Sequence, residues 1–398
     1  MKEDVYIISA VRTAIGRYGG TLRTVTSGEL GSIVIKEGLK RAGVSPGQVD
    51  EVIMGEVRQS TESTNMARVA ALRAGLPEEV PAFTVNRLCA SAMQAMYSGY
   101  LQVASGEAGV VVVGGAENMS RAPHYIRSAR WGDGQVQLID SNLEGGPGAQ
   151  PNEIYGSDLS MGMTAENVAE KYNVSRQDQD AFALRSHQLA TRAIQEGKFK
   201  EEIVPVEIKA KKKSLVFDTD EHVRPETTLE ILAGLKPAFR PGGSVTAGNS
   251  CGRNDGAAAM VLASGKAVKD QGLTPMGRLV GFIAAGVSPR YMGIGPVPAV
   301  KQLLGKLGLS LADIDLIEIN EAFASQALAC IRELDLDLDR VNVNGGGIAL
   351  GHPLGATGCR LGVTLLYEMK RRNLRLGLAT LCVGGGQGMA VVLENITE

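Results

Sequence analysis

Two stretches of the chain repeat one pattern, and this repeat decides the fold. Leu39–Glu56 reads LKRAGVSPGQVDEVIMGE, and Leu304–Glu321 reads LGKLGLSLADIDLIEINE. They align without a gap: each holds a helix end, a glycine at its C′ position, a turn, Val or Ile before Asp, and an apolar strand. The repeat predicts two homologous halves.

Two further pairs of segments echo each other in the same order. Val85-Asn86 in the first half matches Val343-Asn344 in the second, and VVVGGAENM (Val111–Met119) matches LCVGGGQGM (Leu381–Met389). A coincidence of turn residues is the alternative, but the preserved order argues against it. In both halves apolar strands alternate with helical stretches, which is typical of a layered α/β unit.

The expected strands follow from short apolar runs between turn signals. They are Asp4–Ser9, Glu51–Gly55, Ala82–Asn86 and Val110–Val113 in the first half, and Leu316–Ile319, Val341–Asn344 and Gly377–Cys382 in the second. Residues 121–249 match neither half. We expect an inserted loop domain there, with the N-terminal half at 1–120 plus 250–272 and the C-terminal half at 273–398.

The inserted stretch carries two local signals. Ser175-x-x-Asp178 predicts the start of a helix at about Arg176–Gly197, and IVPVEIKAKKKSLVFDTDE predicts a hairpin. The basic run Lys209–Lys213 fits a solvated hairpin tip better than a phosphate ligand.

Composition limits the possible functions. The 398 residues are 44% hydrophobic and 21% charged, with a formal net charge of -2, so neither nucleic acid nor a membrane is expected as a partner. No apolar run approaches the length of a membrane span, and MKEDVYIISAVRT is too acidic to resemble a signal peptide. Five scattered cysteines without CxxC spacing predict neither disulfides nor a metal site, and a reducing, cytoplasmic location is expected.

Cys89 lies in TVNRLCASAMQAM (Thr84–Met96), between a strand and an apolar helical run. A helix N-terminus favours the thiolate, so this position is expected to lower the thiol pKa. The alternative is a buried structural cysteine.

His352 lies in the glycine-dense loop VNVNGGGIALGHPLGATG (Val341–Gly358). A histidine on such closely packed backbone can take a proton from Cys89, as a thiol–imidazole pair requires. A lone core histidine is the alternative reading.

Two more segments end strands with polar groups. Cys382 lies in LCVGGGQGM (Leu381–Met389), beside a glycine turn whose N–H groups can bind an oxyanion. Asn320 and Glu321, in INEAFA (Ile319–Ala324), lie at a strand exit, where α/β folds usually bind ligands.

These four blocks, CASAMQA, NEAFA, GGGIALGHPLGATG and CVGGGQG, resemble the signature blocks of the thiolase family in order and approximate spacing. ENMSRAPH, MGMTAENVA, DEHVRP, TAGNSCGRNDGAAA and YMGIGPVPA resemble that family too. The resemblance covers nearly the whole chain. It implies a five-layered αβαβα core of two similar halves, with a loop domain that binds coenzyme A.

The resemblance also assigns catalytic roles. Cys89 is expected to carry the acyl group, and His352 to activate it and hold the thioester oxygen, beside a water fixed by Asn320. Cys382 is expected to move the substrate's α proton, and the N–H groups of Cys89 and Gly384 to form a second oxyanion hole. No metal and no tightly bound cofactor are implied.

The resemblance further implies residues that bind the substrate or coenzyme A. These are Cys251, Arg224, Met161, Met292, Ala247, Gly248 and Phe323. Arg224 fits a salt bridge to a neighbouring carboxylate equally well. The expected partners are acyl-CoA, CoA and further copies of the chain, as a dimer or tetramer.

Four positions depart from the family pattern: Ala92 and Cys251 replace the usual glycine and serine, Arg253 a usual apolar residue, and Ser160 the histidine of short-chain biosynthetic members. Met161 and Met292 nevertheless favour short acyl chains. The expected reactions, within fatty acid metabolism, are condensation of two acetyl-CoA to acetoacetyl-CoA and cleavage of 3-ketoacyl-CoA by CoA.

Three alternatives stay open. One is a degradative thiolase of broader chain length, and another is a decarboxylating synthase, against which Cys382 argues. The third is a non-catalytic acyl-CoA-binding protein. Among the remaining residues, His187 is expected on the surface, Cys330 and Cys359 in the core, and His124 and His222 near the ligand.

Overall fold

The N-terminal half of the chain builds one mixed sheet. In the computed structural model, which describes residues 3–132, 136–209 and 214–396, its main strands lie in the order β1, β11, β5, β3 and β4. Their bounds in that order are Val5–Thr13, Asn254–Ser264, Val110–Asn118, Glu51–Gly55 and Ala82–Val85. The first two pairings, β1–β11 and β11–β5, are antiparallel, and the next two, β5–β3 and β3–β4, are parallel.

The C-terminal half repeats this topology. Its strands lie in the order β12, β15, β14 and β13, with the bounds Gly277–Gly286, Gln387–Asn395, Leu376–Val383 and Leu316–Ile319. Their pairings are antiparallel, antiparallel and parallel in turn. The two sheets join where Tyr6 and Ile7 of β1 pair with Arg278 and Gly277 of β12. The shared pairing pattern confirms two homologous halves.

The prediction of a strand at Val341–Asn344 is wrong. Only an isolated parallel bridge between Val341 and Ile317 stands where β4 stands in the other half. Asn342 has a positive φ of 47°, which breaks the extended backbone. Its side chain instead exchanges hydrogen bonds with the backbone of Ile319 at 2.9 Å, so it closes the end of β13.

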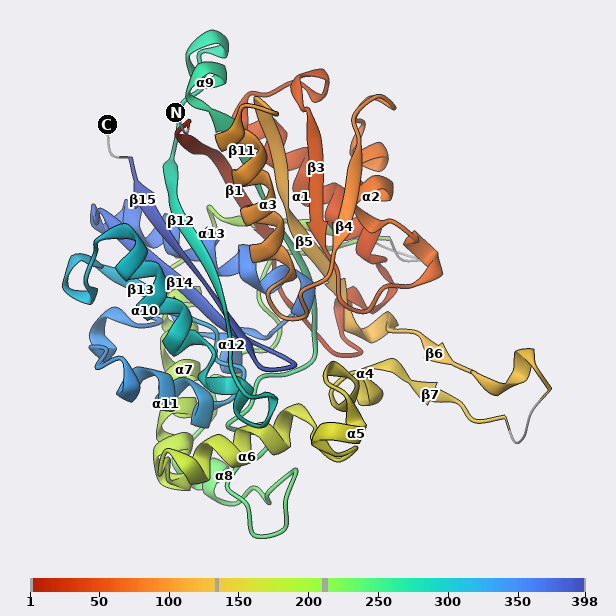
Figure 1. The fold of residues 1–398 in the computed structure, drawn as a ribbon, viewed down its shortest axis with the longest axis vertical. Helices are drawn as coiled ribbons and strands as arrows, with labels where there is room; N and C mark the ends of the chain where they lie inside the picture. The colour runs from red at the N-terminus through yellow and green to blue at the C-terminus, as the bar shows by residue number, and fades with distance from the viewer. Residues whose placement is uncertain (1–2, 133–135, 210–213, 397–398) are drawn as a thin grey trace.

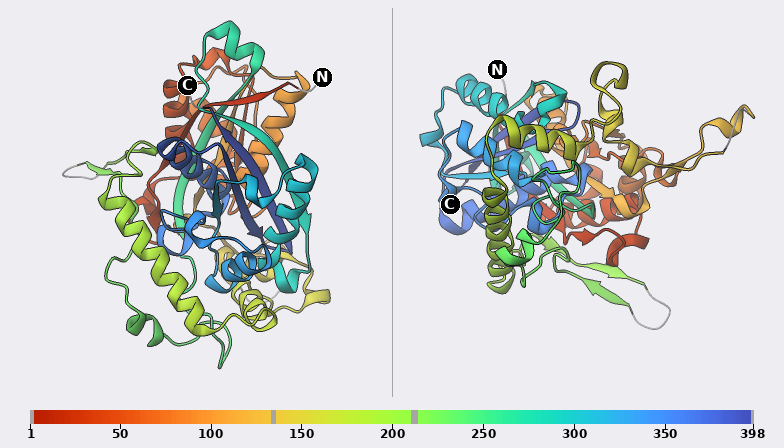
Figure 2. Two further views of the ribbon diagram at one scale, coloured as in Figure 1. Left: turned by 90° about the vertical axis from the view of Figure 1, so that its left-hand side faces the viewer. Right: turned by 90° about the horizontal axis from the view of Figure 1, so that it is seen from below.

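Helices complete five layers. α3 (Ser91–Ser105) and α13 (Leu354–Arg372) pack against each other between the two sheets. α1 (Ser27–Ala42) and α2 (Met66–Ala74) cover the outer face of the first sheet, and α10 (Pro296–Leu307) covers that of the second, with α11 (Ala324–Glu333) packed beside it. Figures 1 and 2 show this αβαβα stack from three sides.

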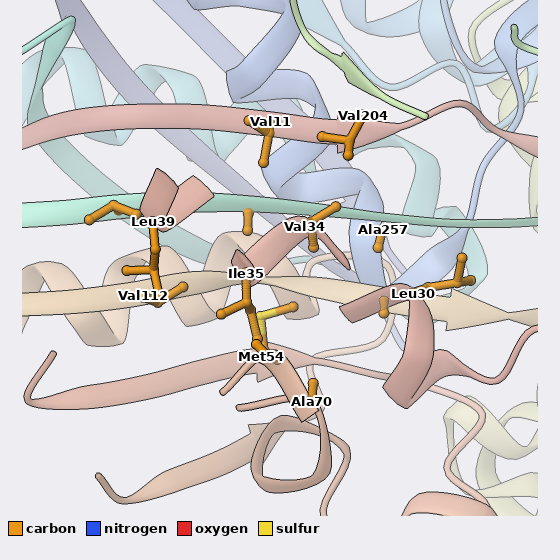
Figure 3. Packing of buried hydrophobic residues seen from close by; sticks show 14 of the residues in the cluster. Val11, Leu30, Val34, Ile35, Leu39, Met54, Ala70, Val112, Val204 and Ala257 are labelled. Carbon is orange, nitrogen blue, oxygen red and sulfur yellow. The ribbon is translucent and has the colours of Figure 1, made fainter. Parts of the chain in front are cut away.

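Local sequence explains the helix ends and the apolar layers. α1 begins at a capping box of Thr26 and Glu29, and the repeated glycines Gly43 and Gly308 end α1 and α10 in the left-handed region, as predicted. Between α1 and the sheet, Leu30 and Ile35 are fully buried (Figure 3). Each such side chain stabilises the fold by about 1.5–3 kcal/mol.

The stretch between the halves folds over one end of the core. α6 (Met161–Lys171) is followed by α7 (Arg176–Gln195), which Ser175 caps as predicted by accepting a hydrogen bond from the Asp178 N–H. Arg12 of β1 forms buried ion pairs with Glu202 and Asp220, and thereby fastens this stretch to the first sheet.

Two hairpin-like pairs leave the body of this stretch. β9 (Val206–Ile208) pairs with β10 (Leu215–Phe217) in the predicted hairpin, but the basic run there lies, apart from Lys209, outside the described residues. β6 (His124–Tyr125) and β7 (Ile139–Asp140) form a protruding arm (Figures 1 and 2).

The remaining elements are short. They are β2 (Gly16–Arg17), β8 (Ile203–Val204), α4 (Ser141–Glu144), α5 (Asn152–Tyr155), α8 (Leu229–Ala233), α9 (Gly265–Gln271) and α12 (Gly347–Leu350). Within the described ranges, no helix combines the length and the apolar character needed to cross a bilayer.

Candidate active site

Cys89 lies in a tight turn between β4 and α3. Leu88 takes a positive φ of 46°, and its N–H donates to Asn86 Oδ1 at 2.9 Å. The Ser91 hydroxyl donates to the Leu88 carbonyl at 2.7 Å and accepts from the Arg87 N–H at 2.9 Å. These bonds hold the strained turn, which presents Cys89 just before the helix begins.

The turn opens into a cavity of about 420 Å³ that gathers most of the predicted site. Of the predicted residues, Cys89, His352, Cys382, Gly384, Cys251, Met161, Met292 and Phe323 line it. The nucleophile comes from the N-terminal half, and the imidazole and the segment that holds both the second thiol and the glycine turn come from the C-terminal half, so three separate segments meet here. Groups that lie far apart along the chain thus line one cavity.

The tautomer of His352 follows from its partners. The Thr357 hydroxyl donates its single hydrogen to the Pro353 carbonyl at 2.8 Å, so at 2.7 Å from His352 Nδ1 it must accept the ring N–H. Nε2 is therefore left as the proton acceptor, 3.4 Å from the Asn320 amide nitrogen. Burial and the charge of Arg360 lower the His352 pKa to about 3, so the ring is neutral.

The pKa of the Cys89 thiol differs from the sequence-based prediction. The pKa of Cys89 is raised, not lowered, because burial disfavours the thiolate more than the Gly384 N–H and the charge of Arg58 favour it. Burial, together with the neighbouring thiols, raises the pKa of Cys382 further, and that of Cys251 to about 12. Both catalytic candidates are thus protonated at neutral pH, and Cys89 needs a base.

The glycine turn after β14 supplies a donor. Gly385 and Gly386 have φ of 76° and 84°, a conformation that glycine adopts without strain. This turn aims the Gly384 N–H at the sulfur of Cys89. The same N–H can stabilise an oxyanion that forms on a thioester bound to that sulfur.

Asn320 and Glu321 lie behind the cavity rather than in its lining. Asn320 is fully buried against His352, and its Oδ1 has no hydrogen-bond partner among the described residues. The Glu321 carboxylate accepts hydrogen bonds from Ser186, Asn342 and the Ile348 N–H. Asn320 thus has a free acceptor beside the imidazole, whereas Glu321 ties loops together.

Three predicted binding residues lie outside the cavity lining: Arg224, Ala247 and Gly248. Arg224 and Ala247 are exposed, and Gly248 is buried. Within the described ranges Arg224 forms no ion pair. Its backbone N–H donates to Nδ1 of His187 at 3.2 Å.

Among the other predicted positions, one is wrong. His187 is only 4% exposed, because it is on the inner face of α7, and its pKa is lowered to about 4 by burial and by the charges of His222 and Arg224. Cys330 and Cys359 are buried core residues, as predicted. His222 is partly buried and His124 exposed, and neither lines the cavity.

Part of the wall was missed from sequence. Residues 142–149 of the inserted stretch close one side of the cavity, and Arg58 lines it three residues beyond the end of β3. The signal for Arg58 was available, because it is charged and follows the strand beside that of Cys89. The run EGGPGAQPNE (Glu144–Glu153) is rich in glycine and proline and predicts a loop, but no sequence signal places residues 142–149 against the cavity.

Two family models match the chain. The model "Thiolase, N-terminal domain" covers residues 5–266, and "Thiolase, C-terminal domain" covers residues 273–395. Both halves of the fold and all segments that build the cavity fall inside these ranges.

Characterised relatives match over their full length. The acetyl-CoA acetyltransferase of Pseudomonas aeruginosa is 51% identical over 99% of this chain and 100% of its own length. The β-ketoadipyl-CoA thiolase of the same organism is 51% identical over all of both chains.

Solved structures agree. The Bacillus anthracis acetyl-CoA acetyltransferase superposes with a TM-score of 0.96 at 49% identity over 99% of both chains. Human mitochondrial 3-ketoacyl-CoA thiolase in complex with CoA gives 0.94 at 44% identity, over 99% of this chain and 98% of that one.

Proposed function

This chain belongs to the thiolase family and is an acyltransferase, and we propose that it carries its acyl group on Cys89. The observation that supports this most is that Cys89, His352, Cys382 and Gly384 line one cavity. Thioester exchange needs a sulfur nucleophile that is also a good leaving group, with a base beside it.

In the first half-reaction, His352 Nε2 takes the proton of the Cys89 thiol. The sulfur attacks the carbonyl carbon of an acyl-CoA, and the resulting oxyanion accepts hydrogen bonds from the backbone N–H groups of Cys89 and Gly384. One such donor is worth about 3 kcal/mol in the transition state. When the tetrahedral intermediate collapses, the coenzyme A sulfur leaves with the proton from His352, and the acyl group stays on Cys89.

In the second half-reaction, the Cys382 thiol first gives its proton to water in the cavity, against its raised pKa, and the thiolate then takes the α proton of a second acyl-CoA. A water held by Asn320 beside His352 donates a hydrogen bond to the enolate oxygen, and the enolate carbon attacks the thioester on Cys89. The bond to Cys89 sulfur breaks, and the proton on Cys382 returns to that sulfur. In the cleavage direction Cys382 donates its proton to carbon, which suits a thiol whose pKa is raised.

The proposed substrates are short: two acetyl-CoA in condensation and a short 3-ketoacyl-CoA in cleavage. Met161 and Met292 narrow the cavity, and relatives at about half identity are named for acetyl-CoA and β-ketoadipyl-CoA. A degradative enzyme with a broader chain-length range is the second candidate, favoured by Ser160 in the cavity wall.

Residues 121–249 form, in this proposal, a loop domain that binds coenzyme A between halves at 1–120 plus 250–272 and 273–398. Cys251 and Phe323 would contact the pantetheine arm inside the cavity. Arg224, Ala247 and Gly248 would contact parts of coenzyme A outside it. The solved relative in complex with CoA supports coenzyme A as the ligand.

We also propose a homo-oligomer, cytoplasmic and active in fatty acid metabolism. The arm around β6 and β7 exposes Trp131 at 74%, Val136 at 67% and Leu138 at 64%. Exposed apolar side chains that gather on one protruding arm offer a surface that a partner can cover. Sedimentation that gives a stable monomer at low concentration would rule the oligomer out.

Intact-protein mass spectrometry tests the central claim. After brief exposure to acetyl-CoA or acetoacetyl-CoA, the wild type should gain one acetyl group and Cys89→Ala none. A Cys89→Ala protein that still gains the group would place the nucleophile elsewhere. A wild type that gains none from any 3-ketoacyl-CoA would refute the acyl-Cys89 mechanism.

A further inference from the structure

Arg58 is a cation in a cavity wall that offers it no anion. The lining includes two arginines, Arg58 and Arg253, and among the described residues no aspartate or glutamate. Arg58 Nε is buried and has no hydrogen-bond partner within the same ranges. The thiol–imidazole chemistry described above uses no arginine at this place.

The nearest carboxyl groups do not neutralise Arg58. Glu117 is fully buried, and its carboxylate accepts hydrogen bonds from the backbone N–H groups of Val57, Arg58 and Gly355 at 3.0, 2.9 and 2.8 Å. Glu56 is buried as well, and burial beside Glu117 raises its pKa to about 8. Glu117, whose pKa burial raises and the charge of Arg58 lowers, is thus satisfied by backbone N–H groups, and Glu56 is neutral near pH 7. Glu62, which lines a second cavity together with Arg58 and Glu56, pairs with Arg121. Among the described residues the guanidinium therefore has no ion pair.

The guanidinium packs against the inserted stretch. Gly145 of the inserted stretch lies so close that a methyl group on it would overlap the Arg58 guanidinium. Leu143 and Gly146 of the same loop also line the cavity. A planar cation packed against a bare backbone is pre-organised, so little conformational entropy is lost when it binds an anion.

Arg58 lies near the acyl-carrying sulfur. β3 and β4 are parallel neighbours, and Arg58 and Cys89 each follow the end of one of them. The charge of Arg58 is close enough to favour the Cys89 thiolate. Arg253 differs, because it is exposed and its guanidinium lies 5.9 Å from the Tyr18 ring centroid.

We propose that Arg58 binds a carboxylate at the far end of the acyl chain, so that the site accepts 3-ketoacyl-CoA substrates whose chain ends in a carboxylate. This inference rests on the proposed function, because it needs the acyl group to be bound at Cys89. An arginine pairs with a carboxylate through two parallel hydrogen bonds. The apolar neighbours Leu88, Met119 and Leu143 would pack against the methylene carbons between the two ends.

The test compares two substrates of six acyl carbons that differ only at the chain end: 3-ketoadipyl-CoA, with a carboxylate, and 3-ketohexanoyl-CoA, with a methyl group. The readout is the ratio of their kcat/KM values in CoA-dependent cleavage, in which contacts to coenzyme A cancel. A charged hydrogen bond predicts a wild-type ratio on the order of 10 to 100.

Three variants locate the preference. Arg58→Met removes the charge and keeps the apolar stem, and should bring the ratio close to one, chiefly by raising KM for the carboxylate substrate. Arg58→Lys keeps the charge without the paired donors and should retain part of the preference. Arg253→Met removes the other cavity arginine and should keep the wild-type ratio.

Several results would overturn the proposal: a wild-type ratio near one, a wild-type ratio retained in Arg58→Met, or a preference lost in Arg253→Met. The wild-type ratio needs no variant, so an Arg58→Met protein that fails to fold leaves the test intact. Acylation of Cys89 by both substrates without preference refutes this inference alone. Acylation by neither, in a protein that acetoacetyl-CoA still acylates, also refutes this inference alone, whereas acylation by none of the three refutes the proposed function with it.

Discussion

The echoed segments Val111–Met119 and Leu381–Met389 use their glycines in opposite ways. In the N-terminal half β5 runs straight through Gly114 and Gly115, where a methyl group would overlap the carbonyl oxygens of Ala258 and Gly355. In the C-terminal half the chain turns at Gly385 and Gly386, and the Gly384 N–H points at Cys89. One repeated motif allows close packing in the first half and presents a catalytic donor in the second.

The exits of the matching edge segments differ as well. After Val85 the chain reaches Cys89 within one tight turn and enters α3. After Val341 it passes through α12 before it reaches His352 and enters α13. The duplicated core therefore fixes where these segments converge, whereas local divergence after each strand decides which chemical group arrives there.

The largest expected effect comes from removing the Cys382 thiol, which should impair one half-reaction and leave the other intact. In Cys382→Ser, acylation of Cys89 by acetyl-CoA should persist, because that step does not use Cys382. Cleavage of acetoacetyl-CoA should fall by about 10²- to 10⁴-fold, since a general acid–base group is lost. Mass spectrometry of the acyl-enzyme and the rate of cleavage measure the two steps, and Cys359→Ala, in the core of α13, serves as control. Equal loss of both steps would contradict separate roles for the two thiols.

The next prediction contrasts the two glycine uses directly. Gly115→Ala should lower the free energy of unfolding by about 1–3 kcal/mol, because its methyl group meets rigid backbone. Gly384→Ala should lower it less, since its nearest contacts are the Leu88 Cδ1 atom at 3.0 Å and the Met161 sulfur at 3.4 Å. Urea unfolding of both variants measures the difference. Equal destabilisation would remove the contrast between packing and turn.

A smaller effect concerns the orientation of His352. Thr357→Val removes the acceptor for Nδ1–H and should lower kcat/KM for acetoacetyl-CoA cleavage by about 10- to 100-fold, the equivalent of one buried hydrogen bond. Thr357→Ser keeps the hydroxyl and should restore most of the activity. Thr357→Val activity within twofold of wild type would show that the tautomer is set by other groups.

Local features of the fold and site could be predicted from sequence. β3 and β13 match the predicted strands residue for residue, because each is a short apolar run between clear turn signals. Cys89, His352 and Cys382 could be identified because reactive side chains stand next to strand ends or glycine turns. Such features depend on neighbours in the chain, which the sequence displays.

Features set by distant parts of the chain could not be predicted. The turn at Asn342 depends on its hydrogen bonds with Ile319, and the raised pKa of Cys89 depends on burial under the inserted stretch. His187 was misplaced for the same reason: its helix is rich in polar residues, but one face packs inward. Periodicity alone does not reveal which polar residues lie on that face.

His187 gives the smallest expected effect and tests that correction. Its pKa falls from 6.5 to about 4 in the folded state, so below pH 6.5 the unfolded chain binds more protons and stability drops. His187→Gln keeps an acceptor for the Arg224 N–H. Between pH 6.5 and about pH 5 this variant should lose less stability than the wild type, by at most about 2 kcal/mol. Urea unfolding across this range measures it, with the exposed His124→Gln as control. If the pH dependence of stability is unchanged in His187→Gln, other buried groups cause the loss of stability at acid pH. His187 would then be more accessible to water than its 4% exposure indicates.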